Sequence, residues 1–146
     1  MKIALASDHK GYNLKKELIE YLKETHSIID LGTNSEESVD FPKYGILLGE
    51  TINKKEADLG IAICGTGIGI SIAANKVKNI MCAKISTKEE ARLAKAHNRA
   101  NILALSGNIK KDEAIEMINA YLNEKPLEEE KYIRRINQIK EYENGN

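Results

Sequence analysis

Residues 58–69 read DLGIAICGTGIG, an apolar run that reaches Cys64 and passes directly into a glycine-rich loop. A short, nearly continuous apolar run of this kind is typical of a strand buried on both faces of a parallel sheet. The small and apolar residues that follow, up to Lys76, indicate that a helix begins within the loop. This strand–loop–helix unit predicts an α/β fold and places a thiol where the strand gives way to the helix.

The same alternation continues on both sides of this unit. Strands are predicted at 2–7, 26–32, 58–65, 79–85 and 100–107, and helices at 13–25, 41–55, 66–76, 86–98, 114–122 and after Pro126. Ser86 and Glu89 predict a capping box, and Pro42 fits the first turn of its helix. Five strands alternating with helices predict one domain over residues 1–146, a three-layer αβα sandwich with a Rossmann-like five-stranded parallel sheet and a C-terminal helix. Residues from about 140 to 146 are expected to be a frayed tail.

Composition restricts the class of function. Lys plus Arg equals Asp plus Glu at 22 each, which argues against a dedicated nucleic-acid binder and is compatible with self-association. No stretch approaches the ~18 apolar residues of a membrane-spanning helix, and the opening MKIALASDHKG is too short in apolar residues for a signal peptide. The two cysteines lie in apolar runs and favour free thiols in a cytoplasmic protein, without nucleic-acid or membrane partners.

Polar and glycine-rich segments follow the predicted strands at their carboxyl ends. These segments are SDHKG (7–11), GTNS (32–35), CGTGIG (64–69), KIST (84–87) and SGN (106–108). In open α/β sheets, ligands bind beyond this edge of the sheet. The sequence therefore predicts its functional site there.

The glycine loop does not match the common phosphate-binding motifs. A dinucleotide site has G-x-G-x-x-G after its first strand and an acidic residue at the end of the next, whereas this loop follows the third strand and the next strand runs into 84–86, KIS. A Walker loop ends in Gly-Lys-Ser/Thr, which is missing here. A cysteine phosphatase would have arginine at Ile70, and a receiver domain would have aspartate at Cys64. A buried structural cysteine beside a tight turn stays open as an alternative.

Cys64 has a distinctive predicted environment. The start of the following helix directs N–H groups and the positive end of its dipole toward the loop, which favours a negatively charged sulfur. A thiolate can act as a nucleophile or a general base, and the same N–H groups can bind an oxyanion. Cys82 lies within a predicted strand and is interpreted as structural.

Several motifs together resemble one family. CGTGIGISIAANK (64–76), with SDHKG, GTNS, SVDFP (38–42) and AHNRANILAL (96–105), is similar to ribose-5-phosphate isomerase type B, whose family also contains galactose-6-phosphate and allose-6-phosphate isomerases. The resemblance extends from Lys2 to about Ile139. It implies an aldose–ketose isomerase that interconverts ribose 5-phosphate and ribulose 5-phosphate through an enediolate, in the pentose phosphate pathway, without metal or cofactor. It also implies a homodimer, or a dimer of dimers, with sites shared between subunits.

The resemblance implies a role for each matching residue. Cys64 would be the base that moves a proton between C1 and C2, Thr66 would help to hold the enediolate, and His97 would open the furanose ring. Residues implied in substrate binding are Asp8, His9, Gly65, Gly67, Ile68, Gly69, Asn98, Lys131 and Arg135, of which His9, Lys131 and Arg135 would contact the phosphate. Asp8 could instead only cap a helix, and His97 could only interact with a helix dipole. We expect Asp8, Cys64 and His97 to face one edge of the sheet, which favours a site.

Three positions depart from the family pattern. Arg99 stands where the family usually has aspartate, Met81 where it usually has arginine, and Lys131 replaces an arginine, with Arg134 nearby. Lysine supplies charge without the bidentate fork of arginine. Two alternatives remain, a six-carbon phosphosugar as substrate and a non-catalytic phosphosugar-binding module on the same fold. The presence of Cys64 together with Thr66 and His97 favours the enzyme.

Overall fold

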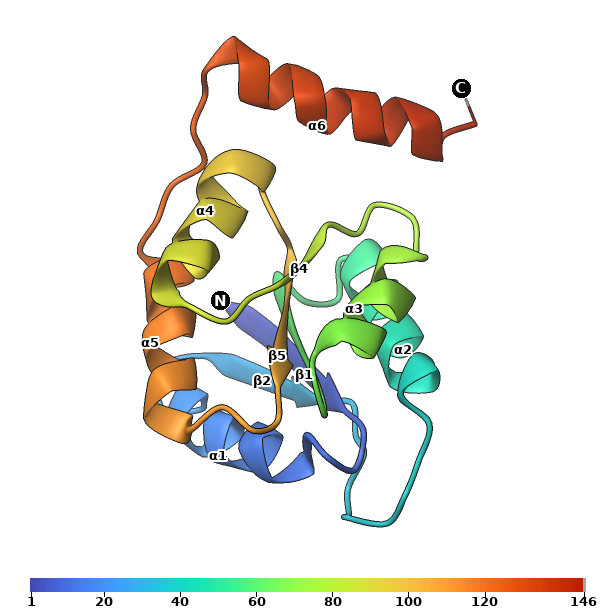
Figure 1. The fold of residues 1–146 in the computed structure, drawn as a ribbon, viewed down its shortest axis with the longest axis vertical. Helices are drawn as coiled ribbons and strands as arrows, with labels where there is room; N and C mark the ends of the chain where they lie inside the picture. Colours follow the sequence, from blue (N-terminus) through green and yellow to red (C-terminus); the bar gives the residue numbers. More distant parts are fainter. Residues whose placement is uncertain (146) are drawn as a thin grey trace.

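The five strands form one parallel sheet in the computed structural model, which describes residues 1–145 (Figure 1). The strands are β1 (Lys2–Ser7), β2 (Ser27–Asp30), β3 (Leu59–Cys64), β4 (Cys82–Lys84) and β5 (Ile102–Ser106). The helices are α1 (Tyr12–Leu22), α2 (Phe41–Asn53), α3 (Ile68–Asn75), α4 (Lys88–Asn98), α5 (Lys111–Leu122) and α6 (Glu130–Glu143). The strand order is β2-β1-β3-β5-β4, and all four pairs are parallel. The predicted α/β fold is confirmed.

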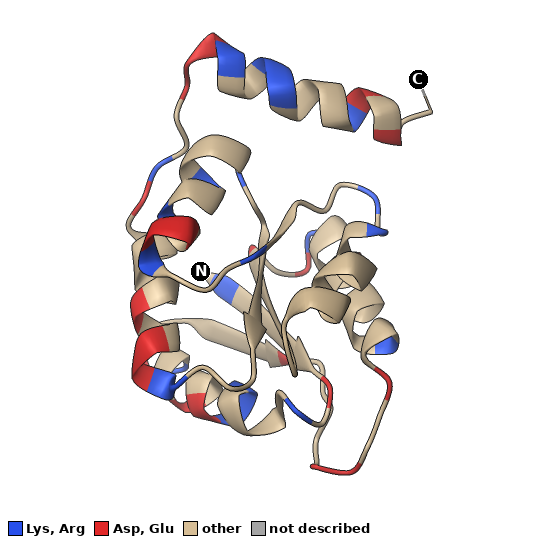
Figure 2. Ribbon diagram, viewed as in Figure 1, with Lys and Arg blue, Asp and Glu red and all other residues tan. Residues whose placement is uncertain are grey.

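The helices cover both faces of the sheet, with α1, α4 and α5 on one face and α2 and α3 on the other (Figure 1). Charged side chains lie mainly on helices and loops, and the strands carry them only at their ends (Figure 2). This distribution is the one expected of a sheet that is buried on both faces.

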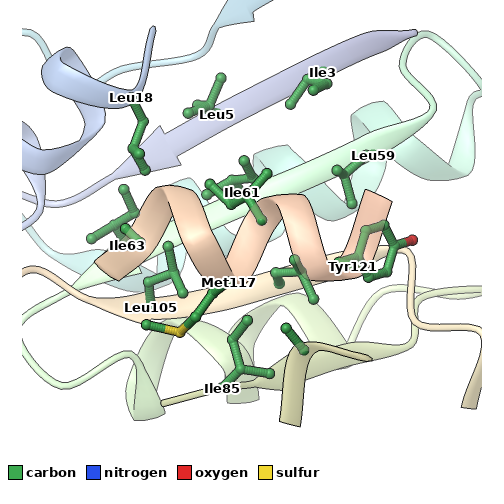
Figure 3. Close-up of a cluster of buried hydrophobic side chains, with 14 of the residues drawn as sticks. Ile3, Leu5, Leu18, Leu59, Ile61, Ile63, Ile85, Leu105, Met117 and Tyr121 are labelled. Carbon is green, nitrogen blue, oxygen red and sulfur yellow. The ribbon is translucent and has the colours of Figure 1, made fainter. Parts of the chain in front are cut away.

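Side chains on the two faces differ in size because successive residues of a strand point to opposite sides. Large aliphatic residues such as Ile61 and Ile63 face α1, α4 and α5, where they pack with Met117 and Tyr121 of α5 (Figure 3). Small residues face the other side, among them Ala62 and Cys64. The alternation therefore directs the Cys64 thiol toward the layer that contains α3.

The start of α4 differs by one residue from the prediction. Thr87, not Ser86, is the N-cap, and its hydroxyl accepts a hydrogen bond from the N–H of Glu90 at 3.0 Å. The Glu90 carboxylate in turn accepts from the N–H of Ser86 at 2.6 Å. The capping box predicted for Ser86 and Glu89 is wrong, because Thr87 and Glu90 offer the same chemistry at the same spacing one residue later.

Helix α6 lies across the end of the molecule opposite the carboxyl ends of the strands (Figure 1). Ile136 is its one buried residue, and near its end the Glu143 carboxylate accepts from the N–H of Asn79 at 2.8 Å. The frayed tail predicted from about residue 140 is therefore wrong for residues 140–143, which are helical, and residue 146 lies outside the described residues. Neither α6 nor any other helix within residues 1–145 is long and apolar enough to cross a membrane.

A buried cation supports the loop that leads from β2 toward α2. The Lys15 side chain is 1% exposed, and its ammonium lies 2.5 Å from Oδ1 of Asp30, which is 42% exposed. The same oxygen accepts a hydrogen bond from the N–H of Gly32 at 3.0 Å. Asp30 therefore compensates the buried charge and also fixes the first turn of the loop.

Replacing Asp30 with alanine is expected to destabilise the protein by about 2 kcal/mol, because the substitution leaves the Lys15 ammonium buried without a counter-charge. Lys15→Met is the matched control, since it removes the charge and keeps an apolar stem, and we expect it to cost less than about 1 kcal/mol. Urea unfolding of both variants gives the comparison. An equal loss of stability in the two variants would contradict this assignment.

Candidate active site

An open cavity of about 490 Å³ lies at the carboxyl ends of β1 and β3. We call it the thiol cavity, and its lining residues are Asp8, His9, Lys10, Ser38, Val39, Asp40, Phe41, Cys64, Gly65, Thr66, Ile68 and Gly69. The cavity lies beyond the carboxyl edge of the sheet, where the sequence predicts the functional site, and it brings together residues that follow β1 and β3. Gly67 is not among the lining residues, because it packs against β5.

The Cys64 thiol is held at the floor of this cavity by the loop that follows it. The residue is 4% exposed, and its Sγ accepts a hydrogen bond from the N–H of Gly67 at 3.2 Å. Gly67 has a φ of 81°, and a Cβ there would lie 2.8 Å from the carbonyl carbon of Leu105. Only glycine fits this turn, and the turn aims a donor at the sulfur, an arrangement suited to a thiolate.

Further donors lie in the loop and the helix that follow Cys64. The Thr66 hydroxyl accepts from the N–H of Ile68 at 3.1 Å, which leaves its own O–H group able to donate. The first four N–H groups of a helix have no acceptor within the helix, so that of Gly69, which lines the thiol cavity in the first turn of α3, is able to bind an anion. A thiol, a hydroxyl and a helix N-terminus therefore meet on one side of the thiol cavity.

Asp8 stabilises a turn and also lines the thiol cavity. Its Oδ1 accepts from the N–H groups of Lys10 at 3.0 Å and Gly11 at 3.1 Å, so it stabilises the turn before α1. Asp8 is buried and lines the thiol cavity. Both turn bonds use Oδ1, and α1 itself has Gly11 as its N-cap without a side-chain cap. Within residues 1–145 the structure gives no hydrogen bond to Oδ2.

The tautomer of His9 follows from its neighbour. Nδ1 accepts a hydrogen bond from the N–H of Val39 at 3.1 Å, so the proton of the neutral imidazole is on Nε2, which can act as a donor. The bond also attaches the loop before α2 to the end of β1. Val39 was not identified from the sequence, because the contact joins segments 30 residues apart.

A second cavity of about 500 Å³ adjoins the thiol cavity. Both are lined by His9, Lys10, Gly65 and Thr66, and the second adds Asn13, Glu36 and Asn108. Sequence reasoning did not single out these last three residues or Lys10. For Lys10 and Asn108 a signal existed, since both lie in the polar segments that follow β1 and β5 at the carboxyl edge.

His97 lies at the other end of the molecule, and the expectation that it faces the same edge as Asp8 and Cys64 is wrong for a single chain. Strands β4 and β5 are parallel, so α4, which connects them, must run back along the sheet. Its C-terminal turn with His97 and Asn98 therefore reaches the amino edge (Figure 1). Asn98 lines a separate cavity of about 230 Å³ there, with Met81 among its neighbours.

His97 meets α6 at this amino edge. The imidazole stacks on the ring of Tyr132, with centroids 4.7 Å apart and planes inclined by 9°, and the Lys131 ammonium lies 5.1 Å from the centroid of the same Tyr132 ring. Most of the Lys and Arg residues of α6 lie in its first half, drawn in blue (Figure 2). We call His97, Asn98, Lys131, Tyr132 and Arg135 the α4–α6 cluster.

The predicted site residues thus form two groups at opposite edges of one chain. Comparison with known proteins shows to which family the chain belongs. Residues 3–139 match the family described as Ribose/Galactose Isomerase. The chain belongs to this isomerase family.

Individual members of the isomerase family are similar over nearly the whole chain. A probable ribose-5-phosphate isomerase B from Mycoplasma genitalium is 39% identical over 145 residues, covering 97% of this chain and 95% of the relative. The galactose-6-phosphate isomerase subunit LacB from Clostridium acetobutylicum is 37% identical over 150 residues, with 99% and 87% covered. The crystal structure of ribose-5-phosphate isomerase B from Mycoplasma genitalium with bound ribulose-5-phosphate superposes with a TM-score of 0.92 at 38% identity, with 99% and 97% covered. The resemblance and the fold are thereby confirmed.

The positions that depart from the isomerase-family pattern lie near the amino edge. Arg99 ends α4 in the left-handed conformation with a φ of 50°, and its N–H donates to the carbonyl of Lys95 at 3.1 Å. Its side chain is exposed. Arg134 is paired with Glu130 of the same helix, and nothing in the structure explains the methionine at position 81.

The second cysteine has a different environment from that of Cys64. Burial raises the pKa of the Cys82 thiol to about 12, so this thiol is protonated at neutral pH. The side chain of Asn75 binds both backbone groups of Cys82, accepting from its N–H at 2.8 Å and donating to its carbonyl at 2.9 Å. Cys82 therefore has a polar neighbour that the sequence did not indicate, and this neighbour satisfies the backbone groups of Cys82 in the edge strand β4, in keeping with a structural role.

Proposed function

We propose that the protein is a ribose-5-phosphate isomerase that interconverts ribose 5-phosphate and ribulose 5-phosphate, with Cys64 as the base. The observation that carries the proposal is the buried thiol of Cys64, which faces an open cavity beside a helix N-terminus and receives an N–H donor on its sulfur. Family membership and the relative that binds ribulose-5-phosphate support the substrate.

The proposed chemistry follows from these groups. In the open-chain aldose, the Cys64 thiolate removes the proton from C2, and the electrons of the broken bond form an enediolate. The Thr66 hydroxyl and the N–H groups at the start of α3 stabilise the negative oxygen. The proton of the C2 hydroxyl passes to O1 and the thiol returns its proton to C1, which leaves a hydroxyl on C1 and the ketone at C2. Asp8 and the Nε2–H of His9 bind polar groups of the substrate in the same cavity.

We infer that each complete site requires two chains. The base lies at the carboxyl edge, whereas the α4–α6 cluster, with its imidazole and cations, lies at the amino edge. A homodimer that brings one chain's thiol cavity against its partner's α4–α6 cluster would unite the two groups. In this arrangement His97 opens the sugar ring, Asn98 binds a sugar oxygen, and Lys131 and Arg135 bind the phosphate.

We also propose a cytoplasmic location. Cys64 and Cys82 are free cysteines, and a thiolate base must stay reduced. Cytosolic glutathione and thioredoxin systems keep thiols in that state.

The test is a turnover assay of the purified protein with ribose 5-phosphate, allose 6-phosphate and galactose 6-phosphate in parallel. Each substrate is assayed with and without EDTA. We expect the highest kcat/KM with ribose 5-phosphate and no loss of rate with EDTA. The family also includes galactose-6-phosphate isomerases, so higher activity on a six-carbon phosphosugar would assign the alternative substrate. Binding of phosphosugar without turnover would indicate a non-catalytic module.

A further inference from the structure

Tyr132 occupies a central place in the α4–α6 cluster. It belongs to the first turn of α6, is half-buried, and stacks almost parallel on the His97 imidazole, with 4.7 Å between ring centroids. The same ring lies 5.1 Å from the Lys131 ammonium. One aromatic side chain therefore contacts both the residue proposed to open the sugar ring and a cation proposed to bind the phosphate.

The stack supplies a constraint that α4 alone cannot give. His97 lies in the last turn of α4, and the χ2 torsion of histidine is broad, so the helix does not fix the plane of the imidazole. The segment of the same chain that leads into α6 is attached to α4, because the N–H of Leu127 donates to the carbonyl of Ala96 at 2.9 Å. Tyr132 is thus presented to His97 from a segment whose position is set independently of the imidazole.

We propose that Tyr132 is a positioning residue for the ring-opening step, because its ring fixes the plane of the His97 imidazole. Ring opening breaks the bond between C1 and the ring oxygen, removes the proton of the C1 hydroxyl and delivers a proton to the ring oxygen. These transfers depend on the direction in which the imidazole nitrogen points. The inference rests on the proposed isomerase function.

Ring opening can be separated experimentally from the step at Cys64. Ribulose 5-phosphate cannot close a furanose ring, because its C5 hydroxyl carries the phosphate. Exchange of its C1 proton with solvent deuterium therefore reports on the enediolate step alone. Turnover of ribose 5-phosphate requires ring opening as well.

The experiment compares Tyr132→Ala and Tyr132→Phe with Tyr142→Ala, a control on the same helix whose side chain is 81% exposed. For Tyr132→Ala we expect kcat with ribose 5-phosphate to fall about 10- to 100-fold through misplacement of the imidazole, with KM within about twofold of wild type. Deuterium exchange into ribulose 5-phosphate should stay close to the wild-type rate. Tyr132→Phe retains the aromatic ring and should restore turnover, and Tyr142→Ala should match wild type.

The outcomes separate the two proposals. If Tyr132 only docked α6, its loss would displace Lys131 and Arg135, so KM would rise and exchange would fall together with turnover; that result overturns the positioning role. Unchanged turnover in Tyr132→Ala also overturns it and leaves the isomerase function intact. Absence of turnover in the wild-type protein would overturn the isomerase function and the inference with it.

Discussion

Replacing Cys64 with alanine is expected to lower isomerase turnover by about 10²- to 10⁴-fold, the range associated with removing a general acid–base group. Among the ionisable residues that line the thiol cavity, Cys64 is the one whose side chain accepts the N–H of Gly67 in the loop before α3, so we expect no other lining residue to replace it as the base. Binding should persist, because Asp8, His9 and the backbone donors remain. Steady-state kinetics and calorimetric titration with ribose 5-phosphate measure the two properties separately.

Cys82→Ala is the matched control for this experiment. The Cys82 thiol is protonated at neutral pH, because burial raises its pKa to about 12, and it lies at the edge strand β4, away from the thiol cavity. We expect this variant to keep turnover within about twofold of wild type, since it removes no ionised group. Wild-type turnover in Cys64→Ala would show that another group is the base.

Mixing two inactive variants is expected to restore activity. Cys64→Ala and His97→Asn should each be strongly impaired, since each removes a proposed acid–base group. If every site combines the thiol cavity of one chain with the α4–α6 cluster of its partner, a dimer of one variant chain and the other contains one site without any substitution. Random assembly from equal amounts then leaves about one quarter of all sites intact, because half of the dimers are mixed.

The opposite mixture provides the control. Combining wild type with a chain that carries both Cys64→Ala and His97→Asn should lower activity to about one quarter of wild type, because every site in a mixed dimer lacks one group. If each site were built within one chain, this mixture would retain about one half, and the first mixture would stay inactive. Subunits are exchanged by co-expression with two affinity tags, and turnover is measured per chain.

These experiments test whether the two groups of residues, which the fold places at opposite edges of the sheet, have separate roles in the reaction. The thiol cavity contains the proposed base and the proposed donors for an enediolate, and the position of Cys64 in it depends on short-range features of β3 and α3. The α4–α6 cluster provides an imidazole and cations at the other end of the sheet. If His97, Lys131 and Arg135 act on the substrate as proposed, neither group suffices alone, and self-association would be a requirement of the chemistry.

Much of the fold could be predicted from the sequence because its signals are local. The apolar runs 2–7 and 58–65 correspond closely to β1 and β3, since strands buried on both faces need continuous apolar residues. The helical conformation of the last residues of α6 could not be predicted from the local sequence, because Glu143 is held there by a hydrogen bond from the distant Asn79. The order of the strands, with β4 at the edge, likewise depends on contacts between distant segments.

For the candidate site, too, the sequence predicts local features but not the relative positions of distant residues. The sequence by itself determined that Cys64 ends a buried strand before a helix, because strand period, glycine spacing and helix start all lie within twelve residues of chain, DLGIAICGTGIG. It also indicated His97 and the basic residues of the last helix. Only the tertiary structure decided that these residues lie away from Cys64. A helix between two parallel strands must return to the amino edge, so α4 carries His97 to the edge opposite Cys64. No local sequence pattern contains the distance between these two edges.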